Sequence, residues 1–295
     1  MTPEVFFEAG MNTGEGPVWD HRTATLYCVD STNPAIWAFA QDGRVLDRMA
    51  LPERIGFIAL TESPGCFIAG LQTGLFDVSL SDRSLDFLMD PEPDLPGNRI
   101  NDGIVDLDGA LVFGSLDDGL TEPTGRTYRL TGDGTLQNYD SGYIVSNGPY
   151  PHPDGERFFH VDSEVGIVRQ FRRNSDRSFR RDGTFCDWDM AEWGIPDGIV
   201  CDTDGGVWIA HWDGGCVSRF DSDGRRSHSI DLPVSRVTKP AFGGPGMKTM
   251  FLTTANRDID CVREPLAGSV FVIETEFTGL ESGIWKRKWT DSRAR

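Results

Sequence analysis

The sequence contains no apolar run that approaches the ~20 residues of a membrane-spanning helix. Its first twenty residues, MTPEVFFEAGMNTGEGPVWD, have neither the basic stretch nor the apolar stretch of a secretory signal peptide. We therefore expect a soluble, cytoplasmic protein that has no membrane partner.

Cationic residues are scarce. The chain has 28 Lys and Arg against 46 Asp and Glu, which gives a formal net charge of −18. This charge repels nucleic-acid phosphates, so we expect no nucleic-acid partner. The excess acid has two explanations, a solubilising surface or carboxylates gathered around a cation, and composition does not separate them.

The usual motifs of nucleophiles, phosphate sites and zinc sites are missing. There is no GxSxG, no P-loop and no GxGxxG between a strand and a helix. The cysteines show no CxxC or CxxH spacing, so we expect reduced thiols in the core rather than zinc ligands or disulfides. The six are Cys28, Cys66, Cys186, Cys201, Cys216 and Cys261. The histidines, including His211 in IAHWDGG, have no ligand spacing either.

What the chain does have is a repeat. Its 34 glycines and 17 prolines separate short runs rich in Val, Ile, Phe and Trp, which is typical of an all-β chain. One strand–turn–strand phrase recurs as NDGIVDLDGALVFGSL from Asn101, NGPYPHPDGERFFHVD from Asn147 and DGIVCDTDGGVWIAHW from Asp197. In each, an Asp-Gly turn follows seven residues after the first polar residue. The same phrase can be traced from Glu15, Gly56 and Thr238, so the six starts are 41 to 50 residues apart.

Six repeats of this length indicate a six-bladed β-propeller with four-stranded blades, formed as a single domain by residues 1–295. A β-helix has much shorter coils, and a sandwich would not repeat one phrase six times. We expect residues 4–10, EVFFEAG, to add a strand to the last blade and so close the ring.

The repeat also predicts a site. The first strand of each propeller blade lines the central channel, so residues at equivalent repeat positions converge at one mouth. These positions hold Glu15, Asn101, Asn147 and Asp197, with Arg99 two residues before Asn101. Two carboxylates and one or two amide oxygens form an incomplete shell for a divalent cation. Taken one at a time, the same residues could instead belong to a loop at Glu15 and to ordinary turns elsewhere.

Five phrases resemble the gluconolactonase and regucalcin-like (senescence marker protein) family of sugar lactonases. They are GEGPVWD, RINDGIVDLDGALVFGSL, SNGPYPHPDG, IPDGIVCDTDGGVWIAHWDGG and VTKPAFGGPGMKTMFLTTA, and the last is most similar to bacterial xylono- and arabinonolactonases. The resemblance runs from about residue 12 to about residue 273. It implies a six-bladed propeller that binds one divalent cation, Ca²⁺, Mg²⁺, Mn²⁺, Fe²⁺ or Zn²⁺, through Glu15, Asn147 and Asp197.

By this resemblance the substrate is a small-molecule sugar lactone, a pentono-1,4-lactone or gluconolactone, which is hydrolysed to the aldonic acid. Asp197 and Asn101 would be catalytic, with Asp197 as the base for the attacking water, and Arg99 and Asn101 would bind substrate. Many members carry a substrate-binding acid where this chain has Asp117-Asp118-Gly119, so either Asp could contact substrate. A regucalcin-like cation-binding protein without significant turnover, an interaction scaffold and another ester hydrolase stay open as alternatives.

Overall fold

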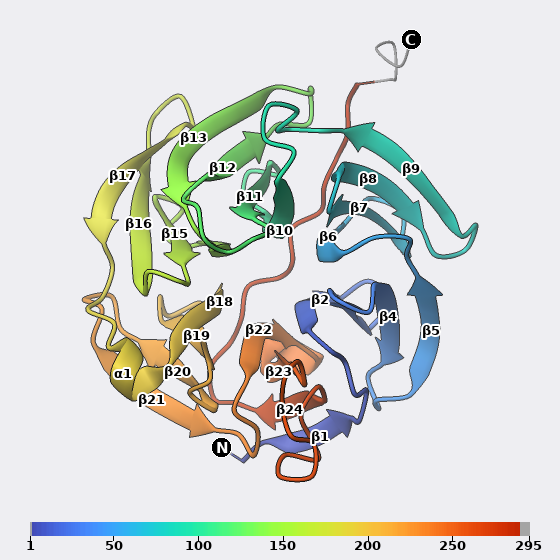
Figure 1. The fold of residues 1–295 in the computed structure, drawn as a ribbon, viewed down its shortest axis with the longest axis vertical. Coiled ribbons are helices and arrows are strands. Elements are labelled where there is room, and N and C mark those ends of the chain that lie inside the picture. Colours follow the sequence, from blue (N-terminus) through green and yellow to red (C-terminus); the bar gives the residue numbers. More distant parts are fainter. Residues whose placement is uncertain (1, 290–295) are drawn as a thin grey trace.

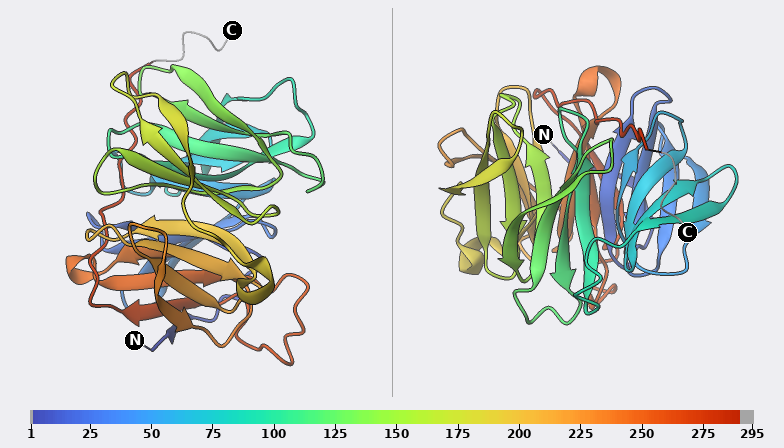
Figure 2. Two further views of the ribbon diagram at one scale, coloured as in Figure 1. Left: turned by 90° about the vertical axis from the view of Figure 1, so that its left-hand side faces the viewer. Right: turned by 90° about the horizontal axis from the view of Figure 1, so that it is seen from above.

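The computed structural model describes residues 2–289, which form a ring of six four-stranded antiparallel sheets around a central channel (Figure 1). The prediction of an all-β, six-bladed propeller is therefore confirmed. Figure 2 shows the ring edge-on from two sides. Within residues 2–289 no helix is long and apolar enough to cross a membrane.

The first three blades follow the chain, and each begins with its innermost strand. Blade 1 is β2 (Gly14–Asp20), β3 (Thr25–Asp30), β4 (Ala35–Ala40) and β5 (Val45–Ala50). Blade 2 is β6 (Ile55–Leu60), β7 (Cys66–Leu71), β8 (Gly74–Ser79) and β9 (Ser84–Met89). Blade 3 is β10 (Asn98–Val105), β11 (Leu111–Asp117), β12 (Gly125–Leu130) and β13 (Leu136–Tyr143).

The last three blades repeat this order until the ring closes. Blade 4 is β14 (Ser146–Pro151), β15 (Arg157–Asp162), β16 (Ile167–Arg173) and β17 (Phe179–Thr184). The short helix α1 (Met190–Trp193) leads into blade 5, which is β18 (Ile195–Cys201), β19 (Val207–Trp212), β20 (Cys216–Phe220) and β21 (Arg226–Asp231). Blade 6 is β22 (Val237–Gly243), β23 (Thr249–Thr254), β24 (Val270–Glu274) and β1 (Glu4–Phe7), with the 3₁₀ turn η1 (Pro245–Met247) after β22.

The N-terminal strand closes the ring, as expected from residues 4–10. β1 pairs antiparallel with β24, so the first strand of the chain completes the last blade (Figure 1). Phe6 packs edge-on against Phe251 of blade 6 and Phe39 of blade 1, with ring centroids 5.1 and 5.9 Å away. Closure leaves no gap between the last blade and the first, which fixes the six channel strands relative to one another.

All six innermost strands carry an irregularity near their start. The pairing with the second strand of the blade shifts register between residues 15 and 18, 55 and 57, 100 and 103, 147 and 150, 196 and 199, and 237 and 239. The six predicted repeat starts fall inside or at the edge of these shifts. A β-bulge places an extra residue in one strand and re-aims its side chains.

These bulges explain the polar–Gly dipeptides that could have been turns. Glu15-Gly16 and Asn147-Gly148 lie within strands, and Gly16 and Gly148 have φ of 51° and 56°, a left-handed conformation that glycine adopts without strain. Asp197 likewise lies within β18. The alternative interpretations, a loop at Glu15 and ordinary turns at Asn147 and Asp197, are therefore wrong. The Asp-Gly pairs seven residues after Asn101, Asn147 and Asp197 are the hairpin turns between the first two strands of their blades.

The cysteines are all free, as predicted. Four are buried and Cys66 is half-buried, but Cys261 is exposed in the loop between β23 and β24. The expectation of a core position is therefore wrong for Cys261.

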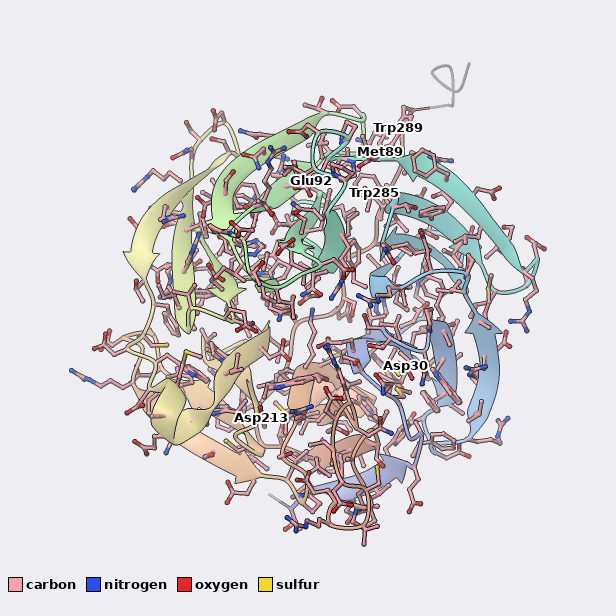
Figure 3. All side chains as sticks on the ribbon, viewed as in Figure 1. Asp30, Met89, Glu92, Asp213, Trp285 and Trp289 are labelled. Carbon is pink, nitrogen blue, oxygen red and sulfur yellow. The ribbon has the colours of Figure 1, made fainter. Side chains whose placement is uncertain are left out.

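The segment after β24 was not anticipated. Residues 275–289 cross the centre of the ring and run out between blades 2 and 3 (Figure 1). Leu280 and Gly283 cover the channel at the ends of the innermost strands, opposite to the end where those strands begin. Further along, the Trp285 amide donates to the Leu60 carbonyl at 2.7 Å, and the buried indole packs between blades 2 and 3 beside Trp289 (Figure 3). This segment closes one end of the channel.

We predict that Trp285→Ala lowers the free energy of unfolding by about 3–5 kcal/mol, because the substitution leaves a cavity in a packed apolar cluster. Chemical denaturation measures this. Phe87→Ala is the control, since Phe87 is 59% exposed and its truncation should cost much less. Equal losses for the two variants would show that the segment does not pack as described.

Candidate active site

A cavity of about 230 Å³ opens at the end of the channel where the innermost strands begin. All five residues singled out from the repeat line it: Glu15, Arg99, Asn101, Asn147 and Asp197. Side chains from blades 1, 3, 4 and 5 therefore meet in one place, as the repeat predicted.

The amides of the site form a connected chain of hydrogen bonds. Arg99 Nη1 donates to Asn101 Oδ1 at 2.9 Å, and Asn101 Nδ2 donates to Asn147 Oδ1 at 2.7 Å. Asn147 Nδ2 donates to Ser163 Oγ at 3.0 Å, and this hydroxyl donates to the Pro196 carbonyl at 2.7 Å. The chain runs from blade 3 through blade 4 to the residue before Asp197, so it fixes the orientation of both amides.

The two carboxylates are not part of this chain of hydrogen bonds. Glu15 Oε2 accepts the Gly16 amide at 3.0 Å, whereas the buried Asp197 Oδ1 has no hydrogen-bond partner within residues 2–289. Burial, followed by the negative charge of Asp102, raises the pKa of Glu15 to about 7. Burial, followed by the negative charge of Glu15, raises the pKa of Asp197 well above its usual range.

These features fit a divalent cation. A buried, unpaired carboxylate oxygen is costly unless something compensates it, and two neighbouring desolvated carboxylates repel each other. Within residues 2–289 no three His, Cys, Asp or Glu side chains gather in a metal-binding arrangement, so a cation here would also need the amide oxygen of Asn147. Carboxylate and amide oxygens are the hard donors that Ca²⁺, Mg²⁺ and Mn²⁺ prefer.

Arg54 was missed in the sequence, although a signal existed. Successive side chains of a strand alternate between its faces, so a residue two positions before a channel-facing one also faces the channel. Arg54 precedes Gly56 by two residues, as Arg99 precedes Asn101, and it lines the cavity. Applying the two-residue period to all six repeats would have found it.

The ambiguous pair Asp117-Asp118 is now divided into two roles. Asp117 Oδ2 accepts the Thr121 amide at 3.0 Å and so stabilises its own loop. Asp118 Oδ1 accepts from Arg54 Nη1 at 2.5 Å and from Arg99 Nε at 3.2 Å. Burial lowers the pKa of Arg99 to about 10, and the Asp118 carboxylate opposes that effect. Asp118 therefore holds two arginines at the cavity.

Trp212 is a second residue that the sequence did not reveal. Its ring lines the cavity and is covered by the Arg236 guanidinium, which lies 4.7 Å from the ring centroid. Arg236 is in turn paired with Asp213 at 2.7 Å (Figure 3). The neighbouring His211 points elsewhere: its Nδ1 contacts the Trp193 carbonyl at 2.8 Å, and burial lowers its pKa to about 4.

Two acidic residues that do not line the cavity, Asp30 and Glu92, hold the segments that carry cavity residues; both are labelled in Figure 3. Asp30 accepts the backbone amides of Thr13 and Thr32, at 3.2 and 3.3 Å, and both threonines line the cavity or its edge. Buried Glu92 accepts from Asn98 Nδ2 at 2.9 Å, which anchors β10 one residue before Arg99.

The family model described as SMP-30/Gluconolactonase/LRE-like region matches residues 13–256, most of the chain. The protein belongs to this family. The match begins at the blade 1 residues of the cavity and ends after β23 of blade 6.

Relatives within the family include sugar lactonases. The L-arabinolactonase of Azospirillum brasilense is 33% identical over 287 residues, with 90% of each chain covered. The pentonolactonase XacC of Haloferax volcanii is 29% identical, with 88% of this chain and 87% of the relative covered.

Solved structures show the same ring. The calcium-binding protein regucalcin from Agrobacterium tumefaciens superposes with a TM-score of 0.87 at 26% identity, covering 95% of this chain and 96% of that one. A luciferin-regenerating enzyme superposes with a TM-score of 0.88 at 25% identity, covering 97% of this chain and 99% of that one.

We predict that metal-free protein loses stability as pH rises from about 4.5, the ordinary pKa of Glu15, to about 7, its raised value. The folded state holds the proton more tightly than the unfolded chain does, so ionisation across this window favours unfolding. Glu15→Gln should make the decline shallower, as measured by thermal unfolding in chelator.

Glu8→Gln, at an exposed position of the same N-terminal region, is the control and should keep the wild-type slope. A Glu15→Gln variant with that same slope would contradict the assignment of a desolvated, ionising Glu15.

Proposed function

We propose that the protein is a metal-dependent lactonase that hydrolyses a sugar lactone, a pentono-1,4-lactone or gluconolactone, to the aldonic acid. The observation that carries this proposal is the buried, unpaired carboxylate oxygen of Asp197, which shares a cavity with Glu15, Asn147 and Arg99. The lactonase relatives support the choice of a cyclic ester.

The metal ligands in this proposal are Glu15, Asn147 and Asp197. With a divalent cation bound, the site would supply a Lewis acid to polarise the ester carbonyl and to stabilise the negative charge of the transition state. Because three protein ligands leave coordination positions open, the site is of the kind that admits water and substrate. Asn101 Nδ2 donates to Asn147 Oδ1 and so fixes the orientation of that ligand amide.

Proton transfer falls to Asp197. Water adds to the lactone carbonyl carbon while the Asp197 carboxylate accepts a proton from it. The ring C–O bond then breaks and the proton passes to the departing ring oxygen, which becomes the free hydroxyl of the aldonic acid. The place of Asp197 in the cavity, beside Glu15 and Asn147, supports this role.

Substrate orientation falls to Arg99 and Asn101. The guanidinium is fixed by Asp118 on one side and by the Asn101 oxygen on the other, so its remaining N–H groups are pre-aimed at sugar hydroxyls. Arg54 and Trp212 are the further lining residues available to contact the sugar. A cavity of about 230 Å³ suits one small sugar ring.

A cation-binding protein without turnover is the second candidate, because the Agrobacterium tumefaciens neighbour is a calcium-binding regucalcin. The same three oxygen ligands serve both functions. Only turnover separates them.

We predict that metal-loaded protein releases acid from 1,4-lactones of arabinonate, xylonate or gluconate above the uncatalysed rate. Glu15→Gln and Asp197→Asn should each lower kcat/KM by at least ~100-fold and weaken metal retention, because each removes a charged ligand. A pH-indicator assay and metal analysis of the purified variants measure these effects.

Exposed Glu8→Gln is again the matched control and should keep wild-type activity. Metal binding without acid release in the wild type would favour the cation-binding alternative. Full activity in either site variant would overturn the ligand assignment.

We predict that Arg99→Lys raises KM about 10-fold with metal affinity unchanged, because an ammonium cannot reproduce the guanidinium's simultaneous contacts with Asp118 and Asn101. Steady-state kinetics and metal titration check the two parts separately. Arg83→Lys, at a half-exposed surface position, should leave KM unchanged. An unchanged KM in Arg99→Lys would remove Arg99 from substrate binding.

A further inference from the structure

Lys239 crosses the channel beneath the cavity. It belongs to β22 of blade 6, and its Nζ donates to Asp102 Oδ1 on β10 of blade 3, on the opposite side of the ring (Figure 1). Lys239 is 5% exposed and Asp102 is 3% exposed. Burying an ion pair costs much of what the pair returns, so stability alone is weak grounds for its presence.

The pair contacts the bulges that carry the site. Asp102 directly follows Asn101, and its Oδ2 accepts the amide of Gly148, the residue after Asn147, at 2.9 Å. The stem of Lys239 passes against Gly198, the residue after Asp197. A Cβ at that glycine would lie 2.4 Å from Lys239 Cγ. One ion pair thus touches the backbone beside three residues of the cavity.

The pair also sets the charge below the cavity. Glu15, Asp102 and Asp197 contribute three negative charges when ionised, and Lys239 contributes one positive charge. The resulting charge of minus two is balanced by one divalent cation. Without the Lys239 charge the net charge of this group would be minus three, and without the Asp102 charge it would be minus one.

We propose that Lys239 and Asp102 are positioning residues of the metal site, which hold the bulges of Asn101, Asn147 and Asp197 in place and set the charge that the cation meets. This inference rests on the proposed function, since it presumes a cation in the cavity. The inference predicts that the two partners of one ion pair affect metal affinity in opposite directions.

The test is a double-mutant cycle on metal affinity. Mn²⁺ is titrated calorimetrically into metal-free wild type, Lys239→Met, Asp102→Asn and the double variant, with circular dichroism to verify folding. We expect Lys239→Met to bind Mn²⁺ at least ~10-fold more tightly and Asp102→Asn at least ~10-fold more weakly, because each changes the charge close to the cation by one unit. The double variant restores minus two and should return to within ~3-fold of the wild type.

Every other outcome would overturn the inference, the proposed function or both. Weaker binding in both single variants would show that the pair acts only by holding the bulges, which would overturn the inference that it sets the charge the cation meets and leave the proposed function intact. Wild-type protein that binds no Mn²⁺, Ca²⁺, Mg²⁺, Fe²⁺ or Zn²⁺ would overturn the proposed function and the inference with it. Should Lys239→Met fail to fold, the comparison of Asp102→Asn with the double variant decides: adding Lys239→Met must restore affinity, and failure to do so contradicts the inference.

Discussion

The register break at the start of every innermost strand is the constraint on which the rest of the structure depends. Because the break lies near the start of each strand, the polar residues beside it come from different blades and line one cavity at that end of the channel. Closure by β1 then holds these residues together, because a closed ring leaves the blades no freedom to separate. Glu15 and Asp197 meet for this reason, although 181 residues of chain separate them.

The rigid ring holds like charges close together, where they repel each other. Burial and the charge of Asp102 raise the pKa of Glu15, and burial and the charge of Glu15 raise the pKa of Asp197. The amide chain through Asn101, Asn147 and Ser163 adds no charge but fixes the geometry around them. Buried carboxylates lower the stability of the protein unless a positive charge offsets them.

Much of the fold and of the site could be predicted from the sequence because the signal is local and repeated. The residues of each strand–turn–strand repeat are adjacent in the chain, and six copies at similar spacing specify the ring. Position within the repeat then sufficed to bring Glu15, Arg99, Asn101, Asn147 and Asp197 together. The hairpin turns at Asp108, Asp154 and Asp204 followed in the same way.

Some features could not be predicted because they depend on which blades face each other across the ring. The contact of Lys239 with Asp102 joins residues 137 positions apart on opposite blades, and no local pattern marks it. The segment that carries Trp285 lies outside the repeat and packs as an irregular chain, so periodicity says nothing about it. Asp117 and Asp118 are neighbours with different roles because alternate side chains of an extended chain point in different directions.

We propose that one divalent cation binds between Glu15, Asn147 and Asp197. Crystals of Mn²⁺-loaded protein, measured at the manganese absorption edge, test it most directly. We expect a single strong anomalous peak about 2.0–2.4 Å from oxygens of all three side chains. A peak elsewhere in the molecule, or none at saturating Mn²⁺, would contradict it.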